Sequence, residues 1–280
     1  MELTAATLKL RQHSLKYERD VQRFLCPIYG VSGSVGKPVG SGFLLELSSA
    51  TLLITVAHVI HEMHYCVLHT LGTTHIVPIE GNPHSTGPRT KQQDPDFGLD
   101  IGFVVLNEAA MQERPKCARL RPADLDVADR PMDTTAYGFV GIPASENQPV
   151  GNIFDGKSYF YGGLPAPRDI YDRLQYRAAT HFIMNFEQWA MIDEASQVIE
   201  VAEPRGMSGG PIFKLGSFQD IEAGTATPRV IGVATEWYPH RDIFVGIRIS
   251  MVVDCIRQML PQFAPELPVP PYVQGIATLR

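Results

Sequence analysis

The segment with the clearest chemical potential is a glycine-flanked serine, Ser208, which lies between Gly206 and the pair Gly209-Gly210. An apolar run starts at Pro211, so we expect the serine on a tight exposed turn before a strand. Glycines in such a turn let backbone N–H groups converge on one point, as an oxyanion hole requires. A serine hydroxyl is a weak nucleophile alone and needs a base and a group that orients the base. Without those partners the turn would be merely structural.

Two residues supply the missing partners. His58 follows the apolar run 54 to 57 and is the candidate base, and Asp100 directly precedes the apolar run 101 to 106. A partly desolvated carboxylate at that point could hold one tautomer of the imidazole. Each residue also has a structural interpretation, a locally satisfied histidine at a strand end and an aspartate that caps a strand. Asp96 is a second choice for the acid.

A histidine-rich segment offers a competing chemistry. Side chains of metal-binding type crowd between positions 58 and 75, namely His58, His61, His64, Cys66, His69 and His75. Their atoms are those that zinc prefers. On a helix, however, a spacing of three residues repeated twice turns the first and third side chains away from each other. A metal-dependent hydrolase is therefore an alternative, with ordinary loop and strand histidines as the other interpretation.

The elements that must position these residues are short strands. Apolar runs rich in Val, Ile and Phe, bounded by Gly, Pro, Asn or Asp, recur along the chain and favour β-structure. The runs 43 to 47 and 51 to 56 predict a hairpin. Further strands are predicted at 75–79, 101–106, 134–140, 181–186, 211–215, 229–237 and 243–249. Many short strands without alternating long helices indicate an antiparallel barrel or sandwich.

Helical spacing is restricted to the two ends. Residues 2 to about 25 predict a helix laid against the main domain, or alternatively a partner-binding helix. A second helix is expected from Ser250, as its N-cap, to Pro261. The segments 81–98 and 141 to about 173 are predicted as long loops, which are more often functional or mobile than neutral. Five prolines after position 260 predict an extended or mobile tail.

Composition excludes several classes of partner. The net charge of −6 argues against nucleic acid and anionic lipid, and no uncharged apolar run is long enough for a membrane span. The four cysteines, Cys26, Cys66, Cys117 and Cys255, are widely spaced and form no CxxC pair. Charged residues interrupt the N-terminus where an export signal would need an apolar core. We therefore expect a cytoplasmic protein with free thiols.

Four motifs in order resemble those of chymotrypsin/trypsin-like serine proteases, which read GxGF, TAAH, DIA and GxSGGP. Here they are Gly-Ser-Gly-Phe at 40–43, Thr-Val-Ala-His at 55–58, Asp-Ile at 100–101 and Gly-Met-Ser-Gly-Gly-Pro at 206–211. The resemblance covers about residues 28 to 260. It implies an all-β protein with two six-stranded antiparallel β-barrels and an active site between them. The predicted organisation is an N-terminal helical extension (1–26), a protease domain (27–260, divided near 120–135) and a proline-rich tail (261–280).

The resemblance also assigns roles. Ser208 would be the nucleophile, His58 the general base and then acid, and Asp100 the group that orients His58. The N–H groups of Gly206 and Ser208 would bind the oxyanion. The implied function is a serine endopeptidase that cleaves a specific protein or peptide substrate through an acyl-enzyme, without metal or organic cofactor. The long loops favour control by a regulatory protein partner. The alternative from another class is a noncatalytic, protease-like peptide-binding module.

Departures from the family pattern are informative. Met207 replaces the aspartate that precedes the nucleophile in members activated by cleavage, and Val59 replaces a common cysteine. Both fit an intracellular enzyme that folds in its active shape or is regulated otherwise. The match puts the base of the specificity pocket near Ala202, with walls near Thr235, Glu236 and Trp237 on one side and a narrowing Phe244 on the other. Because the base lacks aspartate, we expect an uncharged or apolar substrate side chain, although Glu203 and Glu236 could supply a negative wall.

Overall fold

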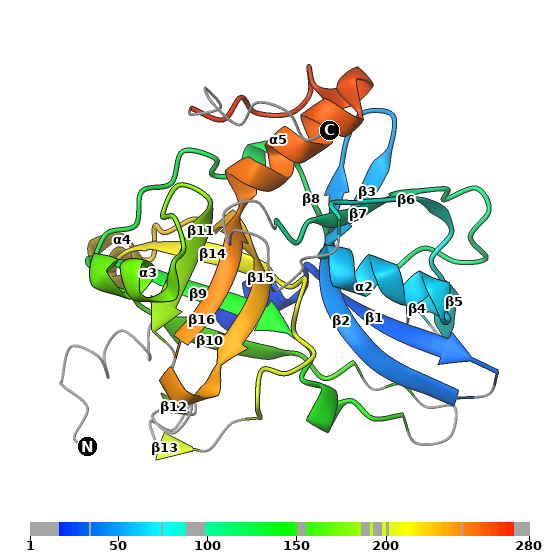
Figure 1. The fold of residues 1–280 in the computed structure, drawn as a ribbon, viewed down its shortest axis with the longest axis horizontal. Coiled ribbons are helices and arrows are strands. Elements are labelled where there is room, and N and C mark those ends of the chain that lie inside the picture. Colours follow the sequence, from blue (N-terminus) through cyan, green and yellow to red (C-terminus); the bar gives the residue numbers. More distant parts are fainter. Residues whose placement is uncertain are drawn as a thin grey trace.

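The computed structural model is built from two curled antiparallel sheets that pack side by side (Figure 1). It describes residues 17–33, 35–73, 75–87, 99–149, 154, 156–185, 191–192, 198–199, 202–241 and 243–271. Strands dominate and the helices are short, so the predicted all-β class is confirmed.

The first sheet follows the path β5-β4-β1-β2-β3-β7-β6. Its strands are β1 (Leu25–Ser32), β2 (Val35–Glu46), β3 (Thr51–Thr55), β4 (Val67–Leu71), β5 (Ile76–Pro78), β6 (Gly81–Ser85) and β7 (Gly102–Leu106). A two-residue strand, β8 (Arg119–Leu120), pairs in parallel with β2 off this path. The sheet thus has more than the six strands expected. Strand β6 was predicted as loop because it lacks apolar alternation, yet it pairs with β7 at the sheet edge, where its proline is tolerated.

The second sheet has the six strands expected, in the order β10-β9-β14-β15-β16-β11. Their bounds are β9 (Thr135–Gly141), β10 (Tyr159–Gly163), β11 (His181–Asn185), β14 (Pro211–Ser217), β15 (Arg229–Tyr238) and β16 (Ile243–Arg248). Two short strands, β12 (Met191–Ile192) and β13 (Val198–Ile199), form a separate pair.

Helical segments connect and cover the sheets. The α-helices are α2 (Ala57–His61), α3 (Arg168–Leu174), α4 (Phe218–Ala223) and α5 (Ile249–Met259). The 3₁₀ turns are η1 (Glu62–His64), η2 (Pro122–Asp124), η3 (Ala144–Glu146), η5 (Pro239–Arg241) and η6 (Pro261–Phe263). No helix among the described residues has the length and apolar character needed to cross a membrane.

Three expectations about local structure need correction. The segment 141–173 is not one loop, because it contains β10 and α3. Helix α5 begins at Ile249 and Arg248 is its N-cap, so Ser250 lies in the first turn and does not cap it. Of the predicted N-terminal helix, residues 17–22 are helical, whereas Leu25 already belongs to β1; residues 1–16 lie outside the described part.

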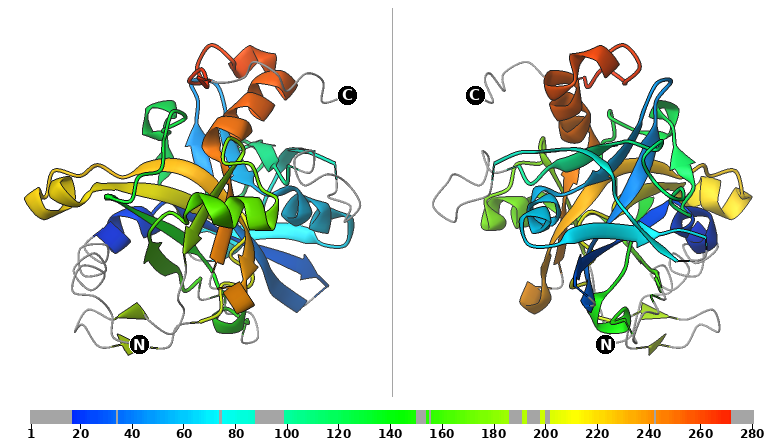
Figure 2. Two further views of the ribbon diagram at one scale, coloured as in Figure 1. Left: turned by 60° about the vertical axis from the view of Figure 1, so that its left-hand side comes forward. Right: turned by 90° about the vertical axis from the view of Figure 1, so that its right-hand side faces the viewer.

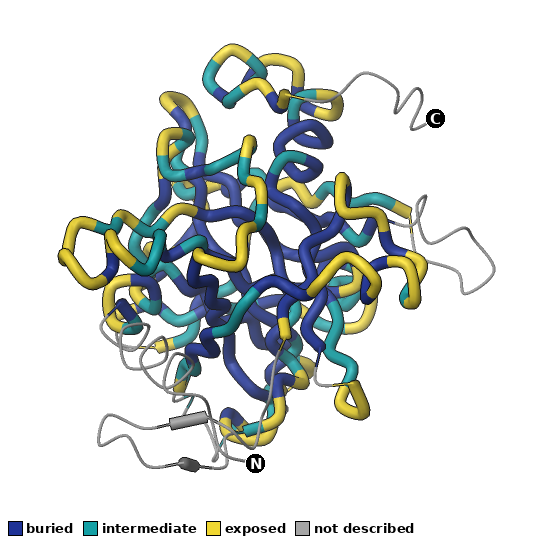
Figure 3. The backbone as a smooth tube through the Cα atoms, turned by 90° about the vertical axis from the view of Figure 1, so that its left-hand side faces the viewer, coloured by how far each residue is buried: buried dark blue, intermediate teal, exposed yellow. Residues whose placement is uncertain are grey.

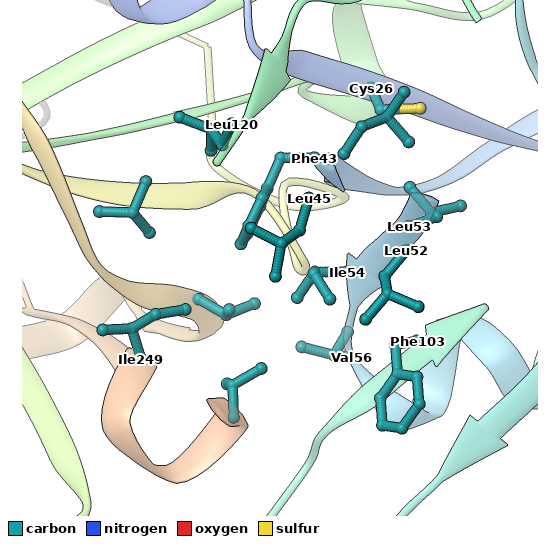
Figure 4. Close-up of a cluster of buried hydrophobic side chains, with 14 of the residues drawn as sticks. Cys26, Phe43, Leu45, Leu52, Leu53, Ile54, Val56, Phe103, Leu120 and Ile249 are labelled. Carbon is teal, nitrogen blue, oxygen red and sulfur yellow. The ribbon is translucent and has the colours of Figure 1, made fainter. Parts of the chain in front are cut away.

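The hydrophobic core is continuous across the two sheets and α5. Figure 4 shows Phe43 and Leu45 of β2, Ile54 of β3 and Phe103 of β7 in one cluster with Ile249, which begins α5. Buried backbone fills the middle of the molecule and exposed residues lie on peripheral loops (Figure 3). The second sheet adds a separate aromatic cluster that includes Tyr137, Phe139, Tyr161, Phe182 and Phe244. The core that the two sheets share with α5 fixes the sheets relative to each other, and the aromatic cluster stabilises the second sheet.

Helix α5 and the start of the proline-rich segment cover one end of the molecule (Figures 1 and 2). The Arg257 guanidinium donates to the carbonyls of Ala264 and Leu267, at 2.5 and 3.1 Å. The Leu267 side chain is buried. Residues 261–271 are therefore packed against the helix, in contrast to the expected mobile tail, and the tail beyond residue 271 lies outside the described residues.

Candidate active site

The first sheet brings His58 and Asp100 together. Strands β3 and β7 are hydrogen-bonded neighbours with Thr55 opposite Gly102, so the residues just after β3 and just before β7 lie side by side. His58 lies in the first turn of α2, which begins two residues after β3, and not on the strand as predicted. A Cβ at Gly102 would lie 2.6 Å from the Val56 carbonyl oxygen. Glycine there lets the start of α2 approach β7 closely.

Asp100 holds both the side chain and the backbone of His58. Its Oδ2 lies 2.6 Å from His58 Nδ1, and its Oδ1 accepts the His58 backbone N–H at 3.0 Å. Burial alone would raise the pKa of Asp100, but the hydrogen bonds and charge of His58 hold it below its ordinary value. Asp100 is therefore ionised, which favours the tautomer with a proton on Nδ1 and leaves Nε2 as the basic nitrogen.

The pKa of His58 is shifted in the opposite direction to that of Asp100, upward. Burial opposes its protonation, but the hydrogen bond and charge of Asp100, with the charges of Glu236 and Glu62, raise the pKa of His58 above its ordinary value. Its side chain is 52% exposed, whereas that of Asp100 is 18% exposed. The pair thus presents an accessible base supported by a shielded carboxylate.

The second sheet supplies the turn that carries Ser208. The Arg205 carbonyl accepts the Ala144 N–H at 2.8 Å, and the Met207 carbonyl accepts the Gly210 N–H at 3.1 Å. In a planar trans peptide the N–H points opposite to the carbonyl, so these bonds direct the N–H groups of Gly206 and Ser208 to the other side. Neither N–H has an acceptor among the described residues. The left-handed φ of +91° at Gly206 makes this orientation accessible.

The Ser208 hydroxyl donates to the Thr235 carbonyl at 3.1 Å. Within the described part of the chain no hydrogen bond joins this hydroxyl to His58. A rotation about the Cα–Cβ bond is needed to bring Oγ to an imidazole, and catalytic hydrogen bonds often form only when substrate is bound.

The predicted Gly-Ser-Gly-Phe motif joins the two sheets at this turn. The Ser41 N–H donates to the Ser208 carbonyl at 2.8 Å, and the Thr55 hydroxyl donates to the Ser41 carbonyl at 2.7 Å. A Cβ at Gly209, whose φ is +93°, would lie 2.0 Å from the Ser41 carbonyl oxygen. The glycine is therefore required for this contact, which fixes the Ser208 turn against the strands that precede His58.

A pocket of about 220 Å³ opens beside Ser208. Its lining contains four of the predicted substrate-binding residues, Thr235, Glu236, Trp237 and Phe244, and also Gly206. Ala202 does not line it, because its carbonyl instead accepts the Tyr161 hydroxyl at 2.6 Å. Sequence reasoning missed three further lining residues, Pro204, Arg205 and Pro239. The first two are neighbours of the serine motif, which is the signal that could have found them.

The walls of this pocket are aromatic with one fixed carboxylate. Phe244 stacks on Phe139 with ring centroids 3.6 Å apart. The Glu236 carboxylate accepts the hydroxyls of Tyr176 and Tyr238 at 3.1 and 2.7 Å. Two hydroxyl donors hold this charge near the site, where it acts on His58 as described above.

The histidine-rich segment does not converge on one point. His61 contacts the Ser85 hydroxyl, His69 the Val67 carbonyl and His75 the Glu113 carboxylate, while His58 pairs with Asp100. The part of the chain that the structure describes contains no group of three His, Cys, Asp or Glu side chains placed to hold a metal ion. The interpretation as a metal site therefore has no geometric support among these residues. Asp96 lies outside the described residues.

The two curled sheets and the site at their junction define the fold of chymotrypsin-like serine proteases. Solved structures with this fold include GrC (granzyme C), at 13% sequence identity and a TM-score of 0.51. The match covers 86% of this chain and 95% of the GrC chain. Another is neuropsin, a serine protease expressed in the limbic system of mouse brain, at 11% identity with a TM-score of 0.54, which covers 85% of this chain and 95% of its own.

No family model and no curated protein matches the sequence. At identities this low, the two structures establish a shared fold. The resemblance predicted from four short motifs is therefore confirmed at the level of the fold.

Proposed function

We propose that the protein is a serine endopeptidase that hydrolyses peptide bonds of a protein or peptide substrate. The observation that carries the proposal is the hydrogen bond from Ser41 to Ser208. It joins the strand region of the His58–Asp100 pair to a turn in which two N–H groups have no acceptor among the described residues. A base with an ionised orienting carboxylate, a serine and convergent donors are the parts that acyl transfer requires.

The mechanism follows from these parts. His58 Nε2 takes the proton of Ser208 Oγ as the oxygen attacks the scissile carbonyl, and the N–H groups of Gly206 and Ser208 stabilise the oxyanion. The imidazolium then protonates the leaving amine, and an acyl-enzyme remains on Ser208. A water molecule, deprotonated by His58, hydrolyses this ester. Asp100 stays ionised and supports the imidazolium throughout.

The wider context of the activity is also a proposal. The pocket beside Ser208 would bind one side chain of the substrate. The long surface loops would suit an enzyme of narrow specificity that a regulatory protein partner controls. A cytoplasmic location agrees with four cysteines that are all free thiols.

Labelling with a fluorophosphonate probe tests the proposed activity. Wild-type protein should be labelled at Ser208, and Ser208→Ala or His58→Ala should abolish labelling and lower turnover by about 10⁴- to 10⁶-fold. Ser48→Ala is the matched control, since Ser48 is exposed and its side chain is not part of the site. Unchanged peptide hydrolysis in correctly folded Ser208→Ala would exclude the proposed nucleophile.

A protease-like peptide-binding module is the second candidate. It is favoured by one observation, the hydrogen bond of the Ser208 hydroxyl to Thr235 in place of His58. This candidate predicts that wild-type protein binds peptides without being labelled and without turnover. Labelling at Ser208 would exclude it.

A further inference from the structure

Two cysteines far apart in sequence lie close together near the start of β1 in the first sheet. Cys26 lies on β1 and is fully buried, and Cys117 lies two residues before β8 and is partly exposed. The Ala118 N–H donates to the Arg23 carbonyl at 2.7 Å, which holds the Cys117 segment against the start of β1. The two thiols lie close enough that each shifts the pKa of the other.

A pocket of about 230 Å³ opens beside this pair. Cys117 lines it, together with Leu25 and Pro27, the two chain neighbours of Cys26. Thr70 also lines it, and its hydroxyl lies 3.1 Å from Cys26 Sγ. A small reagent in the pocket can therefore reach Cys117, whereas Cys26 is buried and does not line the pocket.

The pocket has a positive rim. Arg23 and Lys116 both line it, beside the polar side chains of Gln22 and Ser158. A thiol next to two cations suits a small disulfide that carries carboxylates, because the cations attract the reagent.

We propose that Cys26 and Cys117 are a redox pair that closes to a disulfide by exchange with an anionic low-molecular-weight disulfide of the glutathione type. Deprotonated Cys117 attacks one sulfur of the reagent, whose disulfide breaks, and one reagent thiolate leaves. Deprotonated Cys26 then attacks Cys117 Sγ and displaces the second thiolate. The leaving thiolates take up the two protons that the cysteines release, so one disulfide is reduced and one is formed.

The environments of the two thiols fit this order. The Cys117 thiol lowers the pKa of Cys26 despite its burial, and the Cys26 thiol together with burial raises the pKa of Cys117. The first attack should therefore be slow, since exchange needs the thiolate of Cys117. The second attack should be fast, because Cys26 lies beside the mixed disulfide and the step is intramolecular. The mixed disulfide should not accumulate in wild-type protein.

The disulfide would have a structural consequence. It would close a loop from residue 26 to residue 117 that contains both His58 and Asp100. A cross-link over so long a loop restricts the unfolded chain and should raise the thermal midpoint, on the order of 10 °C. This inference does not depend on Ser208 or on hydrolysis, so its failure would not bear on the proposed activity.

Peptide mass mapping of the full chain after treatment with oxidised glutathione tests the pair. The expected product in wild type is a Cys26–Cys117 disulfide that dithiothreitol reverses, with a higher thermal midpoint before reversal. Cys26→Ser should instead accumulate a stable glutathione adduct on Cys117, and Cys117→Ser should show neither product nor the thermal shift. Cys66→Ser and Cys255→Ser are the matched controls and should behave as wild type.

The role of the reagent's negative charge is tested by comparing oxidised glutathione with a neutral disulfide. Lys116→Gln should slow the reaction with oxidised glutathione severalfold and leave the rate with 2-hydroxyethyl disulfide unchanged. Equal slowing with both reagents, a persistent glutathione adduct in wild type, or linkage of Cys66 as fast as Cys117 would each overturn the proposal.

Discussion

The two sheets hold their parts of the candidate active site by different physical means. In the first sheet the geometry depends on side chains, because both oxygens of Asp100 bind His58, one at the ring and one at the backbone N–H. In the second sheet the geometry depends on the backbone. The carbonyls of Arg205 and Met207 accept hydrogen bonds from Ala144 and Gly210, and these bonds orient the N–H groups of the serine turn.

This difference decides which substitutions are informative. A geometry held by side chains is lost when a substitution of the same shape changes a charge or a hydrogen-bonding group. A geometry held by backbone hydrogen bonds tolerates such substitutions but is lost when a Cβ is added at a residue with positive φ. The first sheet should therefore be sensitive to isosteric changes, and the second to a single methyl group.

Among the changes that test this comparison of the two sheets, the largest effect is expected for Asp100→Asn. The amide has the shape of the carboxylate but no charge, so it favours the wrong tautomer of His58 and no longer stabilises the imidazolium. We expect kcat/KM to fall by about 10⁴-fold, with the thermal midpoint little changed. Hydrolysis of an activated ester and of a peptide measures the loss.

Glu62→Gln is the matched control for Asp100→Asn. Glu62 is also an acid close enough to act on His58, but it pairs with Lys37 at 3.1 Å on the surface. Its loss should change kcat/KM by less than tenfold. Comparable effects of the two variants would mean that general negative charge, and not the Asp100 contact, supports His58.

A smaller effect is expected for Gly206→Ala. A Cβ at this residue would lie 2.9 Å from the Ala144 Cβ, and φ is +91°. Rotation of the Arg205–Gly206 peptide would relieve both problems but turn one N–H away from the oxyanion. We expect kcat to fall by about 10² to 10³-fold, as for the loss of one donor.

The control for this variant is Gly33→Ala. Gly33 also has a positive φ, +60°, but a Cβ there meets nothing within 4 Å. It should leave kcat unchanged and cost about 1 kcal/mol of stability at most. If Gly206→Ala retained full kcat, the proposed role of its N–H group would be wrong.

The sequence predicts some parts of this candidate site and not others, and the difference lies in whether a part depends on local residue patterns. His58, Asp100 and Ser208 could be found because their chemistry is carried by residue type and by short flanking motifs. The glycines around Ser208 predict that N–H groups converge there, since glycine adopts such a turn readily. The family resemblance then implies that the donors are those of Gly206 and Ser208. Most strands were predicted for a similar reason, because their apolar residues are contiguous.

What the sequence did not predict is held together by long-range contacts. Strand β6, rich in Gly, Pro and Asn, forms because β7 offers it a hydrogen-bonding edge. The Glu236 carboxylate is held by Tyr176, which lies 60 residues away in the connection between α3 and β11. The pairing of Cys26 with Cys117 likewise depends on the packing of β1. None of these contacts leaves a local pattern.

The smallest predicted effect concerns an electrostatic interaction between the two sheets, in which the charge of Glu236 on β15 raises the pKa of His58 in α2. General-base catalysis needs a neutral imidazole, so kcat/KM should rise with pH through the pKa of His58. That pKa is raised by Asp100, Glu236 and Glu62 against the effect of burial, so the midpoint should lie above about 6.5.

Glu236→Gln removes one of these charges and keeps the hydroxyl contacts of Tyr176 and Tyr238. The protonated form of His58 then loses support, its pKa falls, and the acidic limb of kcat/KM should move to lower pH by a few tenths of a unit. Activity below the midpoint should rise relative to wild type while the plateau stays similar. A pH profile between about 5 and 9 with an uncharged substrate measures this shift. A limb that stays in place, or moves to higher pH, would show that the carboxylate does not act on His58 across the junction of the sheets.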